Sequence, residues 1–180
     1  YHHFLKVFYE KYNAVKGIEA KPKVDPRILE QQKLLDQATA LLSQEDIVSA
    51  AAEAKVLLSK WKEIKIPFRL ADRELADNFR ATCDKIFELS YLARVVTRKY
   101  PAFALKSEEE QLRTKIREME WLAQREKADL EQAIADFENN PSGDEQEDKA
   151  TQGRINIQKR KVSMKERIVR EFKQRLEAIE

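Results

Sequence analysis

The chain has 180 residues, of which 42% are apolar and 37% are charged, with 34 basic and 32 acidic side chains. So much charge is typical of long helices that expose one face to solvent, while the apolar fraction is enough for a buried core. Three glycines and five prolines leave little material for sheets or glycine-rich phosphate loops, so we expect an all-α fold. The net charge of +2 neither favours nor excludes a nucleic-acid partner.

No run of apolar residues approaches the 18 or so that a membrane span requires, and no leader sequence is visible, so we expect no membrane association. The single cysteine, Cys83, cannot form an internal disulfide, which favours a reducing, cytoplasmic location. Because the chain lacks an initiator Met and starts within a helical pattern, we expect it to be an excerpt of a longer protein.

The first helix is predicted over residues 1–16, where aromatic and apolar side chains recur at steps of three and four. A second helix is predicted to start at Asp25 and Pro26, because the Asp oxygen can accept from an early backbone N–H and Pro needs no donor there. The third helix contains Trp61 and ends before Pro67. A fourth, over residues 72–98, is apolar on two sides and should contact two neighbours.

A long helix is predicted over residues 107–138, because Ser107 and Glu110 have the spacing of a capping box. At 1.5 Å per residue it would span about 48 Å, more than the width of a compact three-helix core. Its apolar positions follow steps of 4-3-4-3-4-3-4, the seam of a coiled coil: Leu112, Ile116, Met119, Ala123, Glu126, Leu130, Ala133 and Phe137. Glu126 interrupts this seam and either specifies the register, as a buried polar group can, or lies at an exposed turn.

An acidic turn over residues 139–150 separates this helix from a last one over residues 151–180. The apolar positions of the last helix are Ile157, Met164, Ile168, Phe172 and Ile179. Two long helices around one turn predict an antiparallel coiled-coil hairpin over residues 107–180.

Charge favours the same pairing. Residues 107–148 contain 14 acidic and five basic side chains, whereas residues 151–175 contain nine basic and two acidic ones. Opposite charges beside a shared apolar seam favour this pairing over self-pairing of either helix, although each exposed pair contributes only about 0.2 to 1 kcal/mol.

The first ten residues repeat the pattern of residues 79–88. Aromatic residues coincide at Tyr1 and Phe79, and again at Tyr9 and Phe87. A repeat of this kind predicts about one and a half copies of a helical unit that stacks on its neighbour to form a core.

Five residues follow a pattern of a Trp, a short turn with Pro and an aromatic-rich helix: Trp61, Pro67, Phe79, Cys83 and Phe87. Here the chain resembles the bacterial helical repeat family known as domain of unknown function 349, over residues 26–88, with residues 1–16 as the tail of a preceding copy. One departure is Lys65, where that family usually has Gly. The resemblance implies a helical repeat core and a coiled-coil-like end, but no catalytic mechanism, because the family has no established activity.

Catalytic, cofactor and metal sites are not expected. His2 and His3 are adjacent, so they point to different helix faces and cannot supply spaced metal ligands. Cys83 shares an apolar stripe with Phe79 and Ile86, which favours core packing over catalysis. The sequence has no phosphate-binding loop or nucleophile motif, and its many carboxylates are most simply a solvated helix face.

Two basic stretches could contact a phosphate backbone. One consists of Arg94, Arg98, Lys99 and Tyr100, and the other of Lys159, Arg160, Lys161, Lys165, Arg167 and Arg170. Against this, the second stretch has few aromatic residues, and the acidic helix competes for its charges. Trp61 could anchor a partner, but the family resemblance favours a structural role between repeat helices.

The sequence therefore predicts a helical repeat body over residues 1–106, with the repeat itself over residues 26–100, followed by the hairpin. The predicted function is a non-catalytic scaffold that presents helical surfaces to another protein or to a second copy of itself. The alternative is an RNA- or ribosome-associated factor that binds through the basic last helix. A supporting subunit of an enzyme is a third, weaker hypothesis.

Overall fold

The computed structural model describes residues 25–179, and the regular elements in this range are all helical, which confirms the all-α prediction. The predicted helix over residues 1–16, with its repeat match and both histidines, lies outside the described residues. The helices are α2 (Pro26–Leu41), α3 (Ile47–Glu63), α4 (Arg73–Lys99), α5 (Glu108–Asn139) and α6 (Glu145–Glu177). Two short 3-10 turns, η1 (Phe68–Leu70) and η2 (Phe103–Leu105), lie in the connections on either side of α4.

The predicted helix starts at Asp25 and Ser107 are confirmed by their capping bonds. An Asp25 carboxylate oxygen accepts from the backbone N–H of Arg27 at 2.9 Å, with Pro26 in the first turn. At α5 the Glu110 backbone N–H donates to Ser107 Oγ at 3.2 Å, and the Ser107 N–H donates to Glu110 Oε2 at 3.3 Å. Both bonds satisfy backbone donors that a helix start leaves without partners.

The acidic turn is shorter than predicted, because α6 begins at Glu145 instead of residue 151. Asp144 caps the helix and accepts from the backbone N–H of Gln146 at 2.8 Å. The acidic side chains that the sequence placed in the turn lie in the first helical turn, where the positive end of the helix dipole stabilises them. Gly143 has a φ of +78°, a left-handed conformation that favours glycine.

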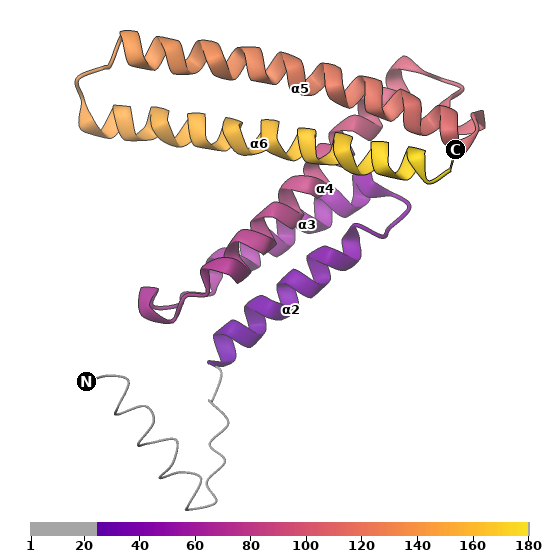
Figure 1. The fold of residues 1–180 in the computed structure, drawn as a ribbon. Helices are drawn as coiled ribbons and strands as arrows, with labels where there is room; N and C mark the ends of the chain where they lie inside the picture. The colour runs from indigo at the N-terminus through magenta and orange to yellow at the C-terminus, as the bar shows by residue number, and fades with distance from the viewer. Residues whose placement is uncertain (1–24, 180) are drawn as a thin grey trace, which may run out of the picture.

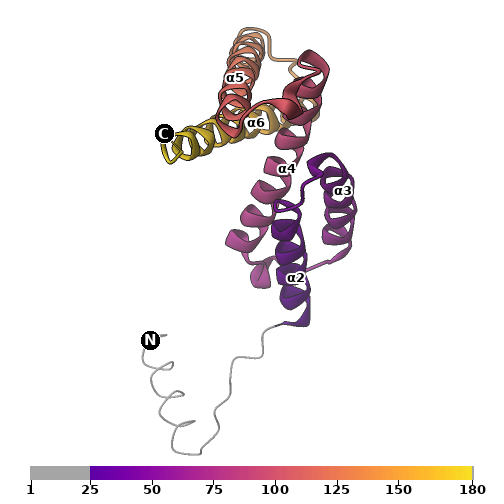
Figure 2. The same ribbon diagram turned by 90° about the vertical axis from the view of Figure 1, so that its right-hand side faces the viewer.

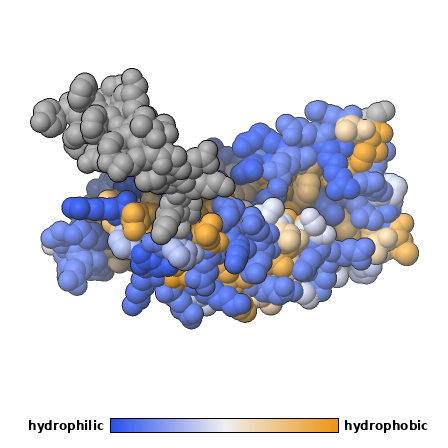
Figure 3. Space-filling view, turned by 90° about the horizontal axis from the view of Figure 1, so that it is seen from below, coloured by the Kyte–Doolittle hydropathy of each residue, from blue (hydrophilic) through white to orange (hydrophobic). Residues whose placement is uncertain are grey.

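Figures 1 and 2 show the arrangement of the helices. Helices α5 and α6 lie side by side and antiparallel, and this hairpin lies across one end of α4. Helices α2 and α3 pack along the other part of α4. The turn between α5 and α6 therefore lies well away from α2 and α3 (Figure 1). Seen from below, the molecule is mostly hydrophilic, with hydrophobic residues in small separate groups (Figure 3).

Helix α4 belongs to two hydrophobic cores. Its first half packs Phe79 and Ile86 against α2 and α3, where the fully buried Ala38 and Ala54 allow close approach. Its second half packs residues such as Leu92 against the two hairpin helices. The boundary predicted at residue 106 falls between α4 and α5. Because α4 packs both against α2 and α3 and against the hairpin, the two predicted parts share this helix.

The residues that resemble the repeat family lie around one aromatic pair. The rings of Trp61 and Phe79 stack at 4.1 Å with an interplanar angle of 9°. Phe87 packs partly buried against the same core, and Pro67 lies in the exposed connection before α4. Cys83 is buried beside Phe79, and burial, with the negative charge of Asp84, raises the pKa of its thiol to about 12.

Replacing Phe79 with Ala is expected to destabilise the fold by about 3 to 5 kcal/mol, because the ring is buried and its loss also unstacks Trp61. Urea unfolding measures the change. The matched control is Phe68→Ala in η1, where the ring is 79% exposed and the guanidinium carbon of Arg73 lies 5.3 Å from its centre. That variant should cost no more than about 1 kcal/mol; equal losses would show that the α2–α4 core is not packed around this pair.

Candidate functional site

Three charged side chains from three helices meet where α4 contacts the hairpin. Lys165 of α6 is almost completely buried, with 4% of its side chain exposed. Its Nζ lies 2.8 Å from Glu88 Oε2 of α4 and also forms an ion pair with Glu126 Oε2 of α5. This group, the Lys165 cluster, links α4, α5 and α6 through one buried ammonium.

The cluster occupies one layer of the hairpin seam. Glu126 lies between the buried Ala123 and Leu130 of α5, and Lys165 follows the buried Val162 of α6. Glu126 is therefore the partly buried polar group that the sequence left as one of two alternatives. Sliding the helices by one heptad would place each charge against apolar side chains without its partner, which is costly in a desolvated seam. The ion pair thus favours a single register.

Glu88 is the desolvated member of the cluster. Burial raises the pKa of its carboxyl group, while the hydrogen bond and charge of Lys165 act in the opposite direction. The nearby negative charge of Glu126 raises the pKa further. Two carboxylates share one ammonium, so the cluster is stable only while Lys165 stays between them.

A second buried carboxylate, Glu118 of α5, lies near the end of α4. It accepts from Lys99 Nζ and from Tyr100 Oη, both at 2.6 Å. Burial alone would raise the pKa of Glu118, but these two hydrogen bonds and the charges of Lys99 and Arg117 lower it. Arg117 also donates to Tyr100 Oη at 2.9 Å. Glu118 therefore fixes the chain reversal between α4 and α5.

The predicted seam residues lie mainly at buried positions. On α5, Leu112, Ile116, Met119 and Leu130 are buried, and Phe137 is partly buried near the hairpin turn. On α6, Met164 and Ile168 are buried in the core that α4 shares with the hairpin, and Phe172 is partly buried there.

Two apolar positions predicted on α6, Ile157 and Ile179, are instead about half exposed. The buried stripe of α6 includes Ile155, Val162, Lys165 and Val169. Because a Lys occupies one of its positions, the apolar spacing in the sequence did not indicate this stripe.

The predicted nucleic-acid face on α6 needs a correction. Lys165 is not on it, because its side chain is buried in the cluster. Arg160 forms an ion pair with Asp84 at 3.4 Å, and Arg167 forms one with Glu171 at 3.1 Å. The remaining predicted members, Lys159, Lys161 and Arg170, are exposed.

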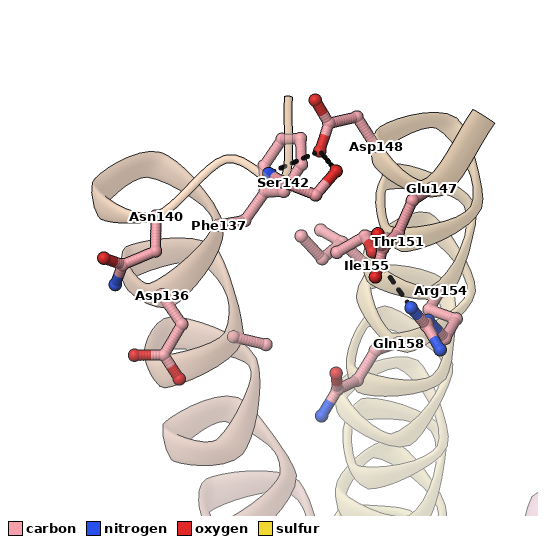
Figure 4. A pocket seen from close by; sticks show the side chains of 11 residues that line it. Asp136, Phe137, Asn140, Ser142, Glu147, Asp148, Thr151, Arg154, Ile155 and Gln158 are labelled. Atoms are coloured by element: carbon pink, nitrogen blue, oxygen red, sulfur yellow. Dashed lines mark hydrogen bonds between the residues drawn. The ribbon is translucent and has the colours of Figure 1, made fainter. Parts of the chain in front are cut away.

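A groove of about 510 Å³ lies at the tip of the hairpin (Figure 4). Phe137 and Ile155 form its apolar part, and the backbone N–H and hydroxyl of Ser142 donate to Asp148 Oδ1 at 3.0 and 2.8 Å. These bonds tie the turn to the first turn of α6. Among residues 25–179, no group of three or more His, Cys, Asp or Glu side chains is placed to hold a metal ion.

Sequence reasoning missed Glu88, Glu118 and Trp121. Glu118 was predicted to belong to the solvated carboxylate face, which is wrong because it is buried against Lys99 and Tyr100. Glu88 falls on the apolar side of α4 before Leu92, which is a weak signal of burial. Trp121 is 47% exposed, and Lys99 Nζ lies 4.7 Å from the centre of its ring. No pattern in the sequence distinguished this Trp from a core residue.

No protein-family model, curated protein or solved structure matches the chain significantly. The resemblance to the helical repeat family stays a prediction from the residues quoted above. None of the helices in the described range is both long and apolar enough to span a bilayer.

Replacing Lys165 with Met is expected to destabilise the fold by about 3 to 5 kcal/mol, because it leaves the buried Glu88 and the partly buried Glu126 without a counter-charge. The matched control is Lys173→Met on the same helix, whose ion pair with Glu120 is about half exposed and should contribute at most about 1 kcal/mol. Urea unfolding compares the two. Adding Glu88→Gln and Glu126→Gln to Lys165→Met should restore most of the loss; no restoration would show that packing, not charge, dominates at this layer.

The two buried carboxylates should have opposite effects on the pH dependence of stability. Glu88 has a raised pKa, so its stabilising contribution is complete below the ordinary value of 4.5 and is lost as pH rises through the folded-state pKa. Glu118 has a lowered pKa, so its contribution is complete above 4.5 and is lost as pH falls through the folded-state pKa.

Unfolding free energies measured from about pH 3.5 to 8 for the original chain, Glu88→Gln and Glu118→Gln test this sign difference. The unfolding free energy of the original chain minus that of Glu88→Gln should decrease with rising pH. The unfolding free energy of the original chain minus that of Glu118→Gln should increase. Slopes of the same sign would contradict the described environment of one of the two groups.

Proposed function

We propose that the chain is a non-catalytic helical scaffold whose hairpin presents a surface to another protein or to a second copy of the chain. The observation that carries this proposal is a small separate core in the part of the hairpin nearest its turn. Its buried members, Leu130, Ile155 and Val162, come only from α5 and α6. This part of the hairpin packs on itself and leaves its outer faces available.

The hairpin has the properties of a stiff arm. Its helices have 32 and 33 residues, which corresponds to about 50 Å at 1.5 Å per residue. The Lys165 cluster and the core around Met119 and Ile168 attach its base to α4. A rigid arm loses little conformational entropy when a partner binds, which favours its use as an interaction surface.

The environments of the perturbed groups support a structural role for them. The Cys83 thiol has a pKa raised to about 12, so it is not a thiolate at neutral pH. Glu88 of α4 forms an ion pair with Lys165 of α6, and Glu118 of α5 forms one with Lys99 at the end of α4. These two carboxylates hold helices together. We include a cytoplasmic location in this proposal, and the single buried thiol agrees with it.

Sedimentation velocity and affinity capture from the source cells, with and without nuclease, test the scaffold role. The variant Ile157→Arg places a charge on an apolar side chain that is half exposed on the arm. We expect it to weaken self-association or capture of a nuclease-resistant protein partner by about 10-fold, because an Arg at an apolar contact must be desolvated.

The matched control is Leu29→Arg on α2, which changes an equally exposed apolar residue of the body. It should leave the association unchanged. Equal effects of both variants would contradict a role for the arm as a protein-binding surface. The same conclusion would follow if the chain were a monomer and nuclease removed every captured component.

A further inference from the structure

A second exposed surface lies at the junction of α4 with α5. It contains two aromatic side chains, Tyr91 and Trp121, which are 50% and 47% exposed. Four cationic residues accompany them, and we name the whole the aromatic-cationic face: Tyr91, Arg98, Lys99, Arg117, Trp121 and Arg125. Tyr91 and Arg98 are seven residues apart on α4 and so share one side of that helix.

Contacts make this face continuous. The ring of Trp121 has Lys99 Nζ at 4.7 Å from its centre and the guanidinium carbon of Arg125 at 5.6 Å. Arg125 and Tyr91 line the same groove, of about 460 Å³, whose other charged lining residues are Glu88, Glu126, Asp129, Lys161 and Lys165. These contacts join Lys99 and Tyr91 of α4 to Trp121 and Arg125 of α5, and Arg117 adds a guanidinium carbon 5.6 Å from the centre of the Tyr100 ring.

The cations of this face are less neutralised than those of α6. Arg98, Arg117 and Arg125 form no ion pair with a carboxylate within residues 25–179, and only Lys99 does so, with Glu118. On α6, six of the ten basic residues are paired with carboxylates, namely Lys149, Arg160, Lys165, Arg167, Lys173 and Arg175, and the other four, Arg154, Lys159, Lys161 and Arg170, form no such pair in the described structure. An anionic partner would displace fewer internal ion pairs from the aromatic-cationic face.

The combination of groups points to a particular anion. Exposed rings can stack on unpaired bases, whereas guanidinium groups bind phosphate oxygens in a bidentate manner. Duplexes keep their bases stacked on each other and offer these rings no partner. We infer that the aromatic-cationic face binds single-stranded nucleic acid, with Trp121 and Tyr91 stacking on bases and Arg98, Arg117 and Arg125 contacting phosphates.

This inference goes beyond the scaffold role, and it places the nucleic-acid surface mainly on α4 and α5, next to Lys161 of the face predicted for α6. An acidic protein segment would also be attracted to the arginines, but it would not use the two ring faces as stacking platforms. Dependence on both the rings and the charges therefore distinguishes the two partners.

The test is fluorescence anisotropy with labelled single-stranded RNA and DNA of about 12 nucleotides, and with the matching duplexes, at several salt concentrations. We expect micromolar binding of the single strands, at least about 10-fold weaker binding of the duplexes, and an affinity that decreases with salt. Replacing Trp121 with Leu should weaken binding about 10-fold with an unchanged salt slope, because stacking is lost and no charge changes.

The charge test uses two matched double variants. Arg98→Glu with Arg125→Glu should weaken binding about 100-fold and reduce the salt slope. Lys159→Glu with Arg170→Glu on α6 changes the net charge by the same amount, lies outside the groove that Tyr91 and Arg125 line, and should alter binding less than about 3-fold. Circular dichroism confirms that each variant is folded, which the exposure of these side chains favours.

Three results would overturn the inference. The first is no single-strand binding at low salt, and the second is an equal loss in both double variants. The third is binding of an acidic peptide that depends on Trp121 as strongly as RNA binding does. None of these results affects self-association through the arm, so failure of this inference and failure of the scaffold proposal can be told apart.

Discussion

The arrangement of the hairpin on the body depends on one buried ammonium group. Lys165 Nζ lies between Glu88 of α4 and Glu126 of α5, and no apolar contact in this layer can replace it without leaving a carboxylate unpaired. Apolar seams tolerate shifts by a heptad, because one buried Leu resembles the next. A single Lys with two Glu partners does not, so the cluster determines which turns of α5 and α6 face each other and where both meet α4.

Helix α4 transmits this arrangement to the rest of the molecule. It packs Phe79 against Trp61 at one end and Leu92 against the hairpin at the other, so neither core forms without it. A helix of 27 residues that is buried on two sides behaves as a rigid connection. The direction of the hairpin relative to α2 and α3 is therefore a property of the packed core and not of a flexible linker, as the proposed scaffold role requires.

Neutralisation of charge, more than its total, distinguishes the surfaces of this protein. The chain is nearly balanced overall, and the basic side chains of α6 are mostly paired with Glu and Asp from α4, α5 or α6 itself. The three arginines of the aromatic-cationic face, Arg98, Arg117 and Arg125, form no such ion pair in the described structure. A protein partner for the part of the hairpin nearest its turn and a single-stranded nucleic acid for the aromatic-cationic face, at the junction of α4 with α5, would thus occupy different positions along the hairpin.

Local signals in the sequence determined the helical class, the cap at Ser107 and the α5 seam from Leu112 to Phe137, because these depend on spacing within one segment. The sequence also showed that Glu126 was exceptional. Only the tertiary structure decided its partner, because Lys165 is 39 residues away and was indistinguishable from the solvated lysines around it. The same holds for the exposure of Trp121. Burial and ion pairing are set by which helices pack together, and the period of a single helix carries no information about that choice.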